Sequence, residues 1–171
     1  FVLLVPLLVG AGVVWLVEPV RKVFFSREFQ PLLIAMQTYR VAGVGFLVLT
    51  ALGQLPAAFG IPAGLGDVLV GLTAIRAATA VKQGRLTPAL LWNAFGLLDL
   101  ALALTLGIGT GSSPLHFIPA TPTSALLTLA PVAIVPTFIV PLDVLLHVIS
   151  VWSLNARRVD ARSVVAVSSA R

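Results

Sequence analysis

Three aspartates and one histidine lie inside apolar runs of this sequence, where polar side chains are costly. Asp143 and His147 are four residues apart in PLDVLLHVIS, so a helix would place both on one face. Asp67 and Asp99 lie in two other apolar runs. A charged side chain at the centre of a bilayer costs about 2.5–3.5 kcal/mol even on lenient scales, and such residues commonly mark an ion or substrate pathway. These four residues are therefore the candidate site for binding an ion or ligand, or for relaying protons.

Two roles for this set remain open. Carboxylates attract cations, and an imidazole exchanges protons near neutral pH, so Asp143 could orient His147 while the other two acids line a route. Alternatively, the same groups could serve only as hydrogen-bonding contacts between helices. Further candidates for this packing role are Asn93, Gln54 and Thr50.

His116 and His147 are the only histidines, so they are the only candidates for a haem or a histidine-ligated metal. Haem b in a helical bundle is commonly held by two axial imidazoles. His116 lies in an expected loop, however, so one haem could bridge both residues only if that loop folded inward. The cofactor is otherwise left open.

The usual signatures of an enzyme are missing from the sequence. Without cysteine there are no thiol nucleophiles and no cysteine-ligated metals. Neither G-x-S-x-G nor H-E-x-x-H occurs. The sequence therefore leans away from an enzymatic role.

The elements that must position these residues are apolar helices. Of 171 residues, 58% are hydrophobic and only 10% are charged, whereas a soluble domain has about 25% charged residues. We expect an all-α, polytopic integral membrane bundle that forms a single domain, 1–171. At about 20 residues per span, five spans are predicted, at residues 1–19, 41–59, 64–81, 87–108 and 137–155.

Two segments do not fit simple spans. Residues 22–40 mix charged and aromatic residues and predict a short interfacial elbow leading into the second span. Pro131, Pro136 and Pro141 interrupt the last apolar run, and each removes a helical hydrogen-bond donor. We therefore expect a short or re-entrant piece near 123–135, followed by a break and then the last span.

The basic residues predict the orientation, because they favour the cytoplasmic side of short loops. The predicted loops on one side of the membrane contain no charged residue. The other side receives all eleven basic residues, in three groups: Arg21, Lys22, Arg27 and Arg40; Arg76, Lys82 and Arg85; Arg157, Arg158, Arg162 and Arg171. We expect an outer N-terminus and a cytoplasmic tail, 156–171, in a bacterial inner membrane. The net charge of +5 is then a topology signal, and no nucleic-acid partner is expected.

The candidate residues fall into one layer of the predicted outer half. Counted at 1.5 Å per residue, Asp67 lies roughly 5 Å deep, Asp143 roughly 9 Å, Asp99 roughly 13 Å and His147 roughly 15 Å. The segments around the acids of the third and fourth predicted spans, GLGDVLVGLT (64–73) and GLLDLALALT (96–105), also resemble each other. A composition this rich in Gly, Leu and Ala favours chance as the cause.

Three functions follow as hypotheses. The first is a structural or accessory subunit, or scaffold, of a membrane assembly, with lipid and other membrane subunits or further copies as partners. The second is ion- or proton-linked binding or transport of a small molecule through the Asp/His cluster. The third is a membrane haem b protein.

Overall fold

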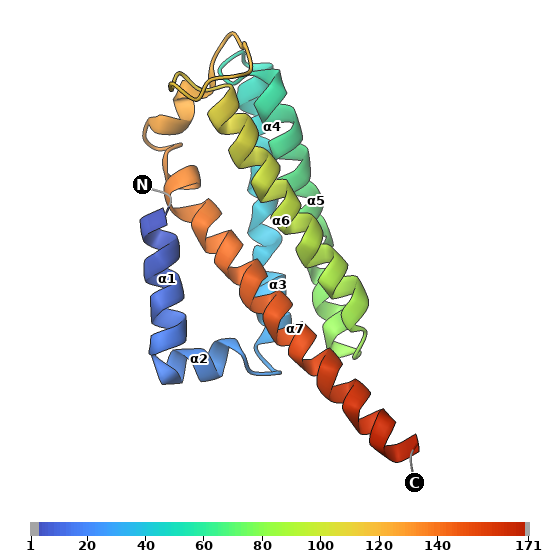
Figure 1. Cartoon of the computed structure of the whole chain (residues 1–171). Coiled ribbons are helices and arrows are strands. Elements are labelled where there is room, and N and C mark those ends of the chain that lie inside the picture. Colours follow the sequence, from blue (N-terminus) through green and yellow to red (C-terminus); the bar gives the residue numbers. More distant parts are fainter. Residues whose placement is uncertain (1–3, 170–171) are drawn as a thin grey trace.

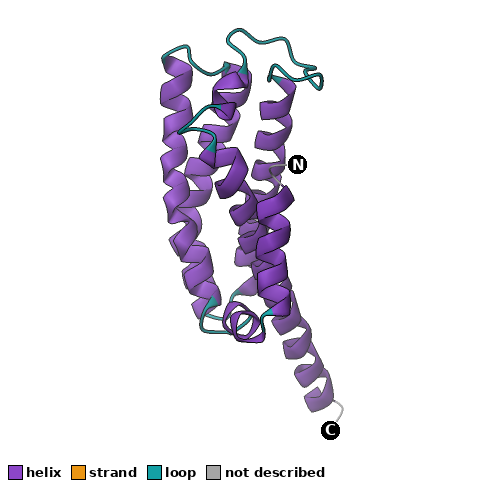
Figure 2. Cartoon of the chain, turned by 90° about the vertical axis from the view of Figure 1, so that its left-hand side faces the viewer, coloured by secondary structure: helices purple, strands orange, loops and turns teal. Residues whose placement is uncertain are grey.

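The computed structural model describes residues 4–169, with side chains described for 4–159, and all regular secondary structure in that part is helical. No strand occurs in that part (Figure 2). The elements, in chain order, are α1 Leu4–Leu16, α2 Glu18–Phe24, α3 Gln30–Met36, η1 Gln37–Gly43, α4 Val44–Ala51, α5 Ala57–Lys82, α6 Leu86–Gly109, η2 Ser124–Thr128, η3 Val135–Ile139 and α7 Val140–Ser169.

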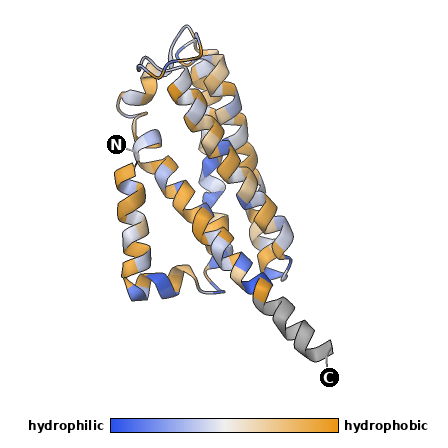
Figure 3. Ribbon diagram, in the orientation of Figure 1, coloured by the Kyte–Doolittle hydropathy of each residue, from blue (hydrophilic) through white to orange (hydrophobic). Residues whose placement is uncertain are grey.

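Four of the helical stretches are long and apolar enough to cross a membrane: Gln30–Ala51, Ala57–Lys82, Leu86–Gly109 and Val135–Val159. A fifth is reached if α1 and α2 are counted as one bent unit, because they meet at 96°. Hydrophobic residues cover most of the length of these helices, and hydrophilic residues gather on α2 (Figure 3). The predicted helical bundle is confirmed at this level.

The helix that corresponds to the second predicted span differs from the expected one. It runs from Gln30 to Ala51 through α3, η1 and α4, where the sequence predicted an elbow over 22–40 and a span over 41–59. Pro31 lies in the first turn of α3, where its missing N–H is not needed, so it starts the helix and does not interrupt it. Gly53, with φ of 68°, lies in the turn that follows α4. As a result, α5 begins at Ala57 and not near Gly64.

The sharp bend near the start of the chain is formed by α2. It crosses the end of the bundle at a steep angle to α1 and lies level with the turn between α5 and α6 (Figure 1). Its exposed polar side includes an ion pair between Lys22 and Glu18. The bend is therefore shorter than the expected elbow and lies earlier in the chain.

The proline-rich segment before the last helix breaks where the sequence predicted. A short 3-10 turn, η2, and a π-helical turn, η3, precede α7. Pro141 occupies the first turn of α7. The helix continues to Ser169, so the expected tail begins as a helical extension of the last apolar helix (Figure 1).

The core forms where α5 contacts α3, η1, α4 and α6, with α7 packed against α3 and α6, and α1 against α7. Small residues such as Ala74 and Ala78 are buried on α5, and small residues let helix backbones approach closely in membranes. The close packing of these helices brings their polar side chains together at mid-length.

Candidate functional site

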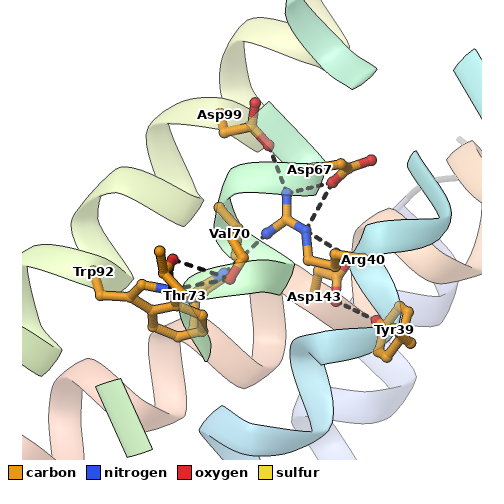
Figure 4. Close-up of polar contacts among 9 residues, drawn as sticks. Tyr39, Arg40, Asp67, Val70, Thr73, Trp92, Asp99 and Asp143 are labelled. Carbon is orange, nitrogen blue, oxygen red and sulfur yellow. Dashed lines mark hydrogen bonds and ion pairs between the residues drawn. The ribbon is translucent and has the colours of Figure 1, made fainter. Parts of the chain in front are cut away.

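The candidate site is organised around Arg40, which lies in the middle of the Gln30–Ala51 helix and is 3% exposed. Arg40 was predicted to lie in the connection before the second span, and that prediction was wrong because the residue lies inside a helix. The guanidinium lies among Asp67 of α5, Asp99 of α6 and Asp143 of α7 (Figure 4). His147 of α7 contacts it as well. All four predicted site residues therefore meet, but they meet around a cation that was not among them.

Each nitrogen of the guanidinium faces one of these side chains. Arg40 Nε donates to Asp67 Oδ1 at 2.7 Å, and Nη2 lies 2.7 Å from the same oxygen. Nη2 also donates to Asp99 Oδ2 at 2.6 Å. Asp67 and Asp99, which come from the two similar segments of α5 and α6, therefore both contact Arg40 Nη2.

Asp143 lies farther from Arg40 than the other two aspartates do. Its Oδ2 lies 4.0 Å from Arg40 Nε, beyond hydrogen-bonding distance, although the carboxylate is only 2% exposed. Its Oδ1 accepts a hydrogen bond from the Tyr39 hydroxyl. Tyr39 and Arg40 are neighbours in sequence, so a single turn of η1 supplies both partners.

His147 has a defined tautomer in this arrangement. An arginine only donates hydrogen bonds, so His147 Nε2 accepts from Arg40 Nη1 at 3.1 Å. The proton therefore lies on Nδ1, which donates to Asn93 Oδ1 at 2.9 Å. Asn93 Nδ2 in turn donates to Ser150 Oγ at 3.1 Å and to the Ala89 carbonyl at 2.8 Å. A buried hydrogen-bonded chain thus extends from Arg40 away from the carboxylates, through neutral groups.

Two glycines make this convergence sterically possible. A Cβ at Gly66 would overlap the carboxylate of Asp99, and one at Gly96 would overlap the ring of His147. Trp92 lies beside the same ring, with centroids 5.1 Å apart, and donates from Nε1 to the Val70 carbonyl at 3.2 Å. The polar side chains therefore pack directly against neighbouring backbone, with large side chains closing the far side.

The site lies deeper than the sequence predicted for Asp67. Because α5 begins at Ala57, Asp67 is ten residues from that helix end, or roughly 15 Å at 1.5 Å per residue. Asp99 is also ten residues from its own helix end, Gly109, or roughly 15 Å. The predicted layer is thus a compact cluster near the middle of the bundle.

A cavity of about 340 Å³ connects this cluster with the loop that follows α6. Ser112, Ser113, Ser124 and Thr128 lie toward the loop, and Asp67 and Asp143 lie at the other end. Its other lining residues are Phe46, Phe59, Leu100, Ala103, Leu104, Gly107, Ile108, Gly111, Ala125, Leu127, Val135, Pro136, Ile139 and Val140. Asp67 and Asp143 are the only charged residues of this lining.

A second cavity, of about 240 Å³, adjoins the first. Tyr39 and Arg40 line it together with Asp67 and Asp143, and Pro131 and Val132 close its other side. The two cavities share both carboxylates as well as Phe46, Val135 and Ile139. The carboxylates therefore face open space from two directions.

Three other predicted residues lie elsewhere or bond locally. His116 is exposed in the loop after α6, where its Nδ1 is 2.6 Å from the Gly111 carbonyl oxygen. Gln54 is exposed in the turn before α5. Thr50 lies against Gly60 of α5, but its hydroxyl donates to Phe46 of its own helix. Of the three residues predicted for interhelical hydrogen bonding, only Asn93 forms such bonds.

The two histidines do not suit a shared haem. His147 uses both ring nitrogens for Arg40 and Asn93, deep in the bundle. Its neighbour Gly96 is thirteen residues, or roughly 20 Å, from the end of α6 that leads into the His116 loop. Among the described side chains, no group of three could hold a metal ion either. The carboxylates converge on the guanidinium and not on an open coordination position.

Comparison with known proteins gives a family but no activity. The model of the family described as "Domain of unknown function (DUF8737)" matches residues 1–155, which is most of the chain, so the chain belongs to this family. No curated protein and no solved structure matches it.

Proposed function

We propose that this member of the DUF8737 family is a membrane protein that binds a small organic cation beside Asp67 and Asp143, in exchange for protons. The observation that carries the proposal is the excess of carboxylates over cations in the cluster. Three aspartates surround one guanidinium, and His147 is neutral because it accepts a hydrogen bond from that guanidinium.

The charge count explains why something must be bound. With all three acids ionised, the cluster carries a net charge of −2, and charge within a membrane is strongly unfavourable. Arg40 is most closely engaged by Asp67 and Asp99. Asp143 is therefore the acid whose charge is least compensated. A proton or an external cation beside it would bring the cluster closer to neutrality.

The cavity walls indicate the kind of cation. Phe46 and Phe59 pack edge to face, with centroids 5.4 Å apart, and both line the larger cavity. Its volume of about 340 Å³ is within the range of about 300–1,000 Å³ typical of small-molecule sites. Aromatic faces attract cations, and apolar walls favour apolar groups. A protonated amine with an apolar body fits this cavity, because its ammonium group can lie beside the two carboxylates and its body against the apolar walls.

The direction of access follows from the basic residues. Lys22, Arg27, Lys82, Arg85 and Arg157 lie near one end of the bundle, whereas the cavity leads to the uncharged loop at the other. Under the positive-inside tendency, the cavity opens to the outer side of a bacterial inner membrane.

Because the chain has no cysteine, single cysteines at Ser112 and Gln83 can be labelled without background. Membrane-impermeant maleimide should label Ser112→Cys in intact cells and leave Gln83→Cys unlabelled, and the reverse pattern would invert the assigned orientation.

The binding test uses phenethylamine as a cationic probe and 2-phenylethanol as its neutral counterpart. Purified protein should retain radiolabelled phenethylamine, and 2-phenylethanol should compete poorly. Asp143→Asn should abolish retention while keeping the fold, because an amide oxygen still accepts from Tyr39. Glu18→Gln, which removes an exposed carboxylate from α2, is the matched control and should bind normally.

Proton exchange is measured separately in proteoliposomes that contain a pH-sensitive dye. Adding phenethylamine outside should release protons from wild-type protein and not from Asp143→Asn. If the folded Asp143→Asn variant binds the probe as well as wild type does, the proposal fails. The cluster would then act in packing, as in the accessory-subunit hypothesis.

A further inference from the structure

The end of the bundle that lies opposite the cavity carries a second site, here called the basic niche. It is a cavity of about 240 Å³ lined by Phe25, Arg27, Trp152, Ser153, Ala156 and Arg157. Arg27 comes from the connection between α2 and α3, and Arg157 comes from α7. Arg157 Nη2 donates to the Ser26 carbonyl at 3.1 Å, which fixes this connection against α7. Two guanidinium groups from distant parts of the chain therefore share one small cavity.

The charge of the basic niche is not balanced by the side chains described around it. Among residues 4–159, the ion pair at this end joins Lys22 to Glu18, and none involves Arg27 or Arg157. Like charges repel, so holding two guanidinium groups in one cavity favours a bound anion. The planar fork of arginine donates two parallel hydrogen bonds, a geometry that suits phosphate oxygens.

An apolar groove continues from the basic niche along the membrane-facing surface. Trp152 and Ala156 line both the basic niche and this groove, which measures about 450 Å³. Its other lining residues are Leu97, Val148, Val151, Asn155 and Val159. Val148 and Trp152 are 38% and 56% exposed, so the groove is open to the surrounding solvent or lipid. Such a shape accommodates a hydrocarbon chain.

An aromatic cluster indicates the depth of this site. Trp15, Phe25 and Trp152 pack together, with ring centroids 5.6–6.3 Å apart. Tryptophan is enriched at the boundary between headgroups and hydrocarbon. The groove therefore extends into the hydrocarbon from the level at which phosphate groups lie.

We infer that this end of the protein binds one anionic phospholipid, with its phosphate between Arg27 and Arg157 and an acyl chain in the groove. Charge complementarity favours a lipid of net negative charge. The headgroup of such a lipid brings no positive group that would be repelled by the two arginines. Basic pockets beside membrane helices are suited to such headgroups. This inference does not depend on the proposed cation site, which lies at mid-length of the bundle and uses other residues.

The test is native mass spectrometry of the full-length protein in detergent, titrated with phosphatidylglycerol or with phosphatidylcholine. We expect a phosphatidylglycerol adduct that is tighter than the phosphatidylcholine adduct. The double variant Arg27→Gln/Arg157→Gln should weaken phosphatidylglycerol binding about tenfold or more and remove the preference. The control, Lys82→Gln/Arg85→Gln, loses two charges from the α5–α6 turn at the same end and should retain the preference.

A second variant keeps both charges and tests the groove. Val148→Trp places an indole in the groove at a residue that does not line the basic niche, so it should weaken phosphatidylglycerol binding while leaving binding of inorganic phosphate unchanged. The inference is overturned if both lipids bind equally to wild type. It is also overturned if the control double variant loses as much affinity as Arg27→Gln/Arg157→Gln, or if Val148→Trp has no effect on lipid binding.

Discussion

Arg40 and Arg157 are the same residue in two opposite settings. The side chain of Arg40 is 1% exposed and surrounded by three carboxylates in the middle of the bundle. Arg157 is half-buried at the basic end, beside another arginine, and its one described hydrogen bond goes to a backbone carbonyl. The hydrogen-bond donors of Arg40 are used by partners within the fold, whereas Arg157 has donors available for a ligand. Burial and partners, and not residue type, therefore decide what an arginine does in this helical bundle.

The largest expected effect comes from making one substitution at both positions. Arg40→Met leaves three carboxylates buried without a cation, and breaking a buried pair by removing one partner typically costs 3–5 kcal/mol. Arg157→Met removes a partly exposed group and should cost less than about 1 kcal/mol. Unfolding in mixed detergent micelles, followed by circular dichroism, gives both values. Equal losses at the two positions would refute the contrast.

The cause of the Arg40 effect is tested by removing the carboxylates as well. In Arg40→Met/Asp67→Asn/Asp99→Asn, most of the stranded negative charge is gone, so part of the lost stability should return. Adding the same two Asp→Asn changes to Arg157→Met should give no such recovery. A triple variant that is even less stable than Arg40→Met would show that the loss is steric and not electrostatic.

A smaller effect is expected where the cluster depends on the absence of a side chain. In Gly66→Ala the new methyl group would displace the Asp99 carboxylate from Arg40, and overpacking of this kind typically costs about 1–3 kcal/mol. Gly12→Ala in α1 is the control, because no atom lies near its added Cβ. Alanine is the better helix former, so the control should be neutral or slightly stabilising in the same unfolding assay. A loss of the same size in Gly12→Ala would mean that the effect is not specific to the cluster.

Hydropathy predicted the architecture well, because a span needs only a sustained apolar run. The limits of the helices were harder to predict. Pro31 was interpreted as part of an elbow, yet a proline in the first turn of a helix is favourable, and nothing in its neighbours distinguishes these cases. The resulting shift moved the second helix toward the N-terminus and placed Arg40 at its middle.

The site was half-predicted for a related reason. The three acids and His147 stood out because apolar residues surround them in the sequence. Arg40 was instead grouped with the basic residues that were expected to lie near a membrane surface. A signal for it was present: three acids inside spans require a cation, and Arg40 lies one residue before a predicted span, 41–59. Tyr39 gave no such signal, because tyrosine is as common at membrane surfaces as it is in buried polar sites. Its contact with Asp143 depends on the packing of η1 against α7.

Tyr39→Phe should have a moderate effect within the cluster. The change removes only the hydroxyl that donates to Asp143 Oδ1, and a single hydrogen bond of this kind contributes about 1 kcal/mol. The variant should unfold slightly earlier and, in the proposed function, bind phenethylamine with altered affinity because Asp143 loses a fixed partner. Tyr39→Trp would not serve as a control, since it changes volume. The comparison is with Thr73→Val on α5, whose hydroxyl bonds within its own helix and to Trp92 outside the cluster. An unchanged phenethylamine affinity in Tyr39→Phe would separate Tyr39 from the binding site.

The smallest effect is expected for the exposed ion pair of α2, which sharpens the contrast with Arg40. Lys22 Nζ lies 2.7 Å from Glu18 Oε1, a distance like those around Arg40, but these side chains are 73% and 63% exposed. Exposed pairs of this i,i+4 kind contribute only about 0.3–0.5 kcal/mol and are screened by salt. Glu18→Gln should therefore cost about that much at low ionic strength and nothing measurable in molar salt. The cost of Arg40→Met should persist in the same salt, because it leaves Asp99 without its cation, and Asp99 lines neither cavity and is only 5% exposed. If salt removed both costs alike, Asp99 would have to be accessible to bulk ions, and the distinction between the two arginines would fail.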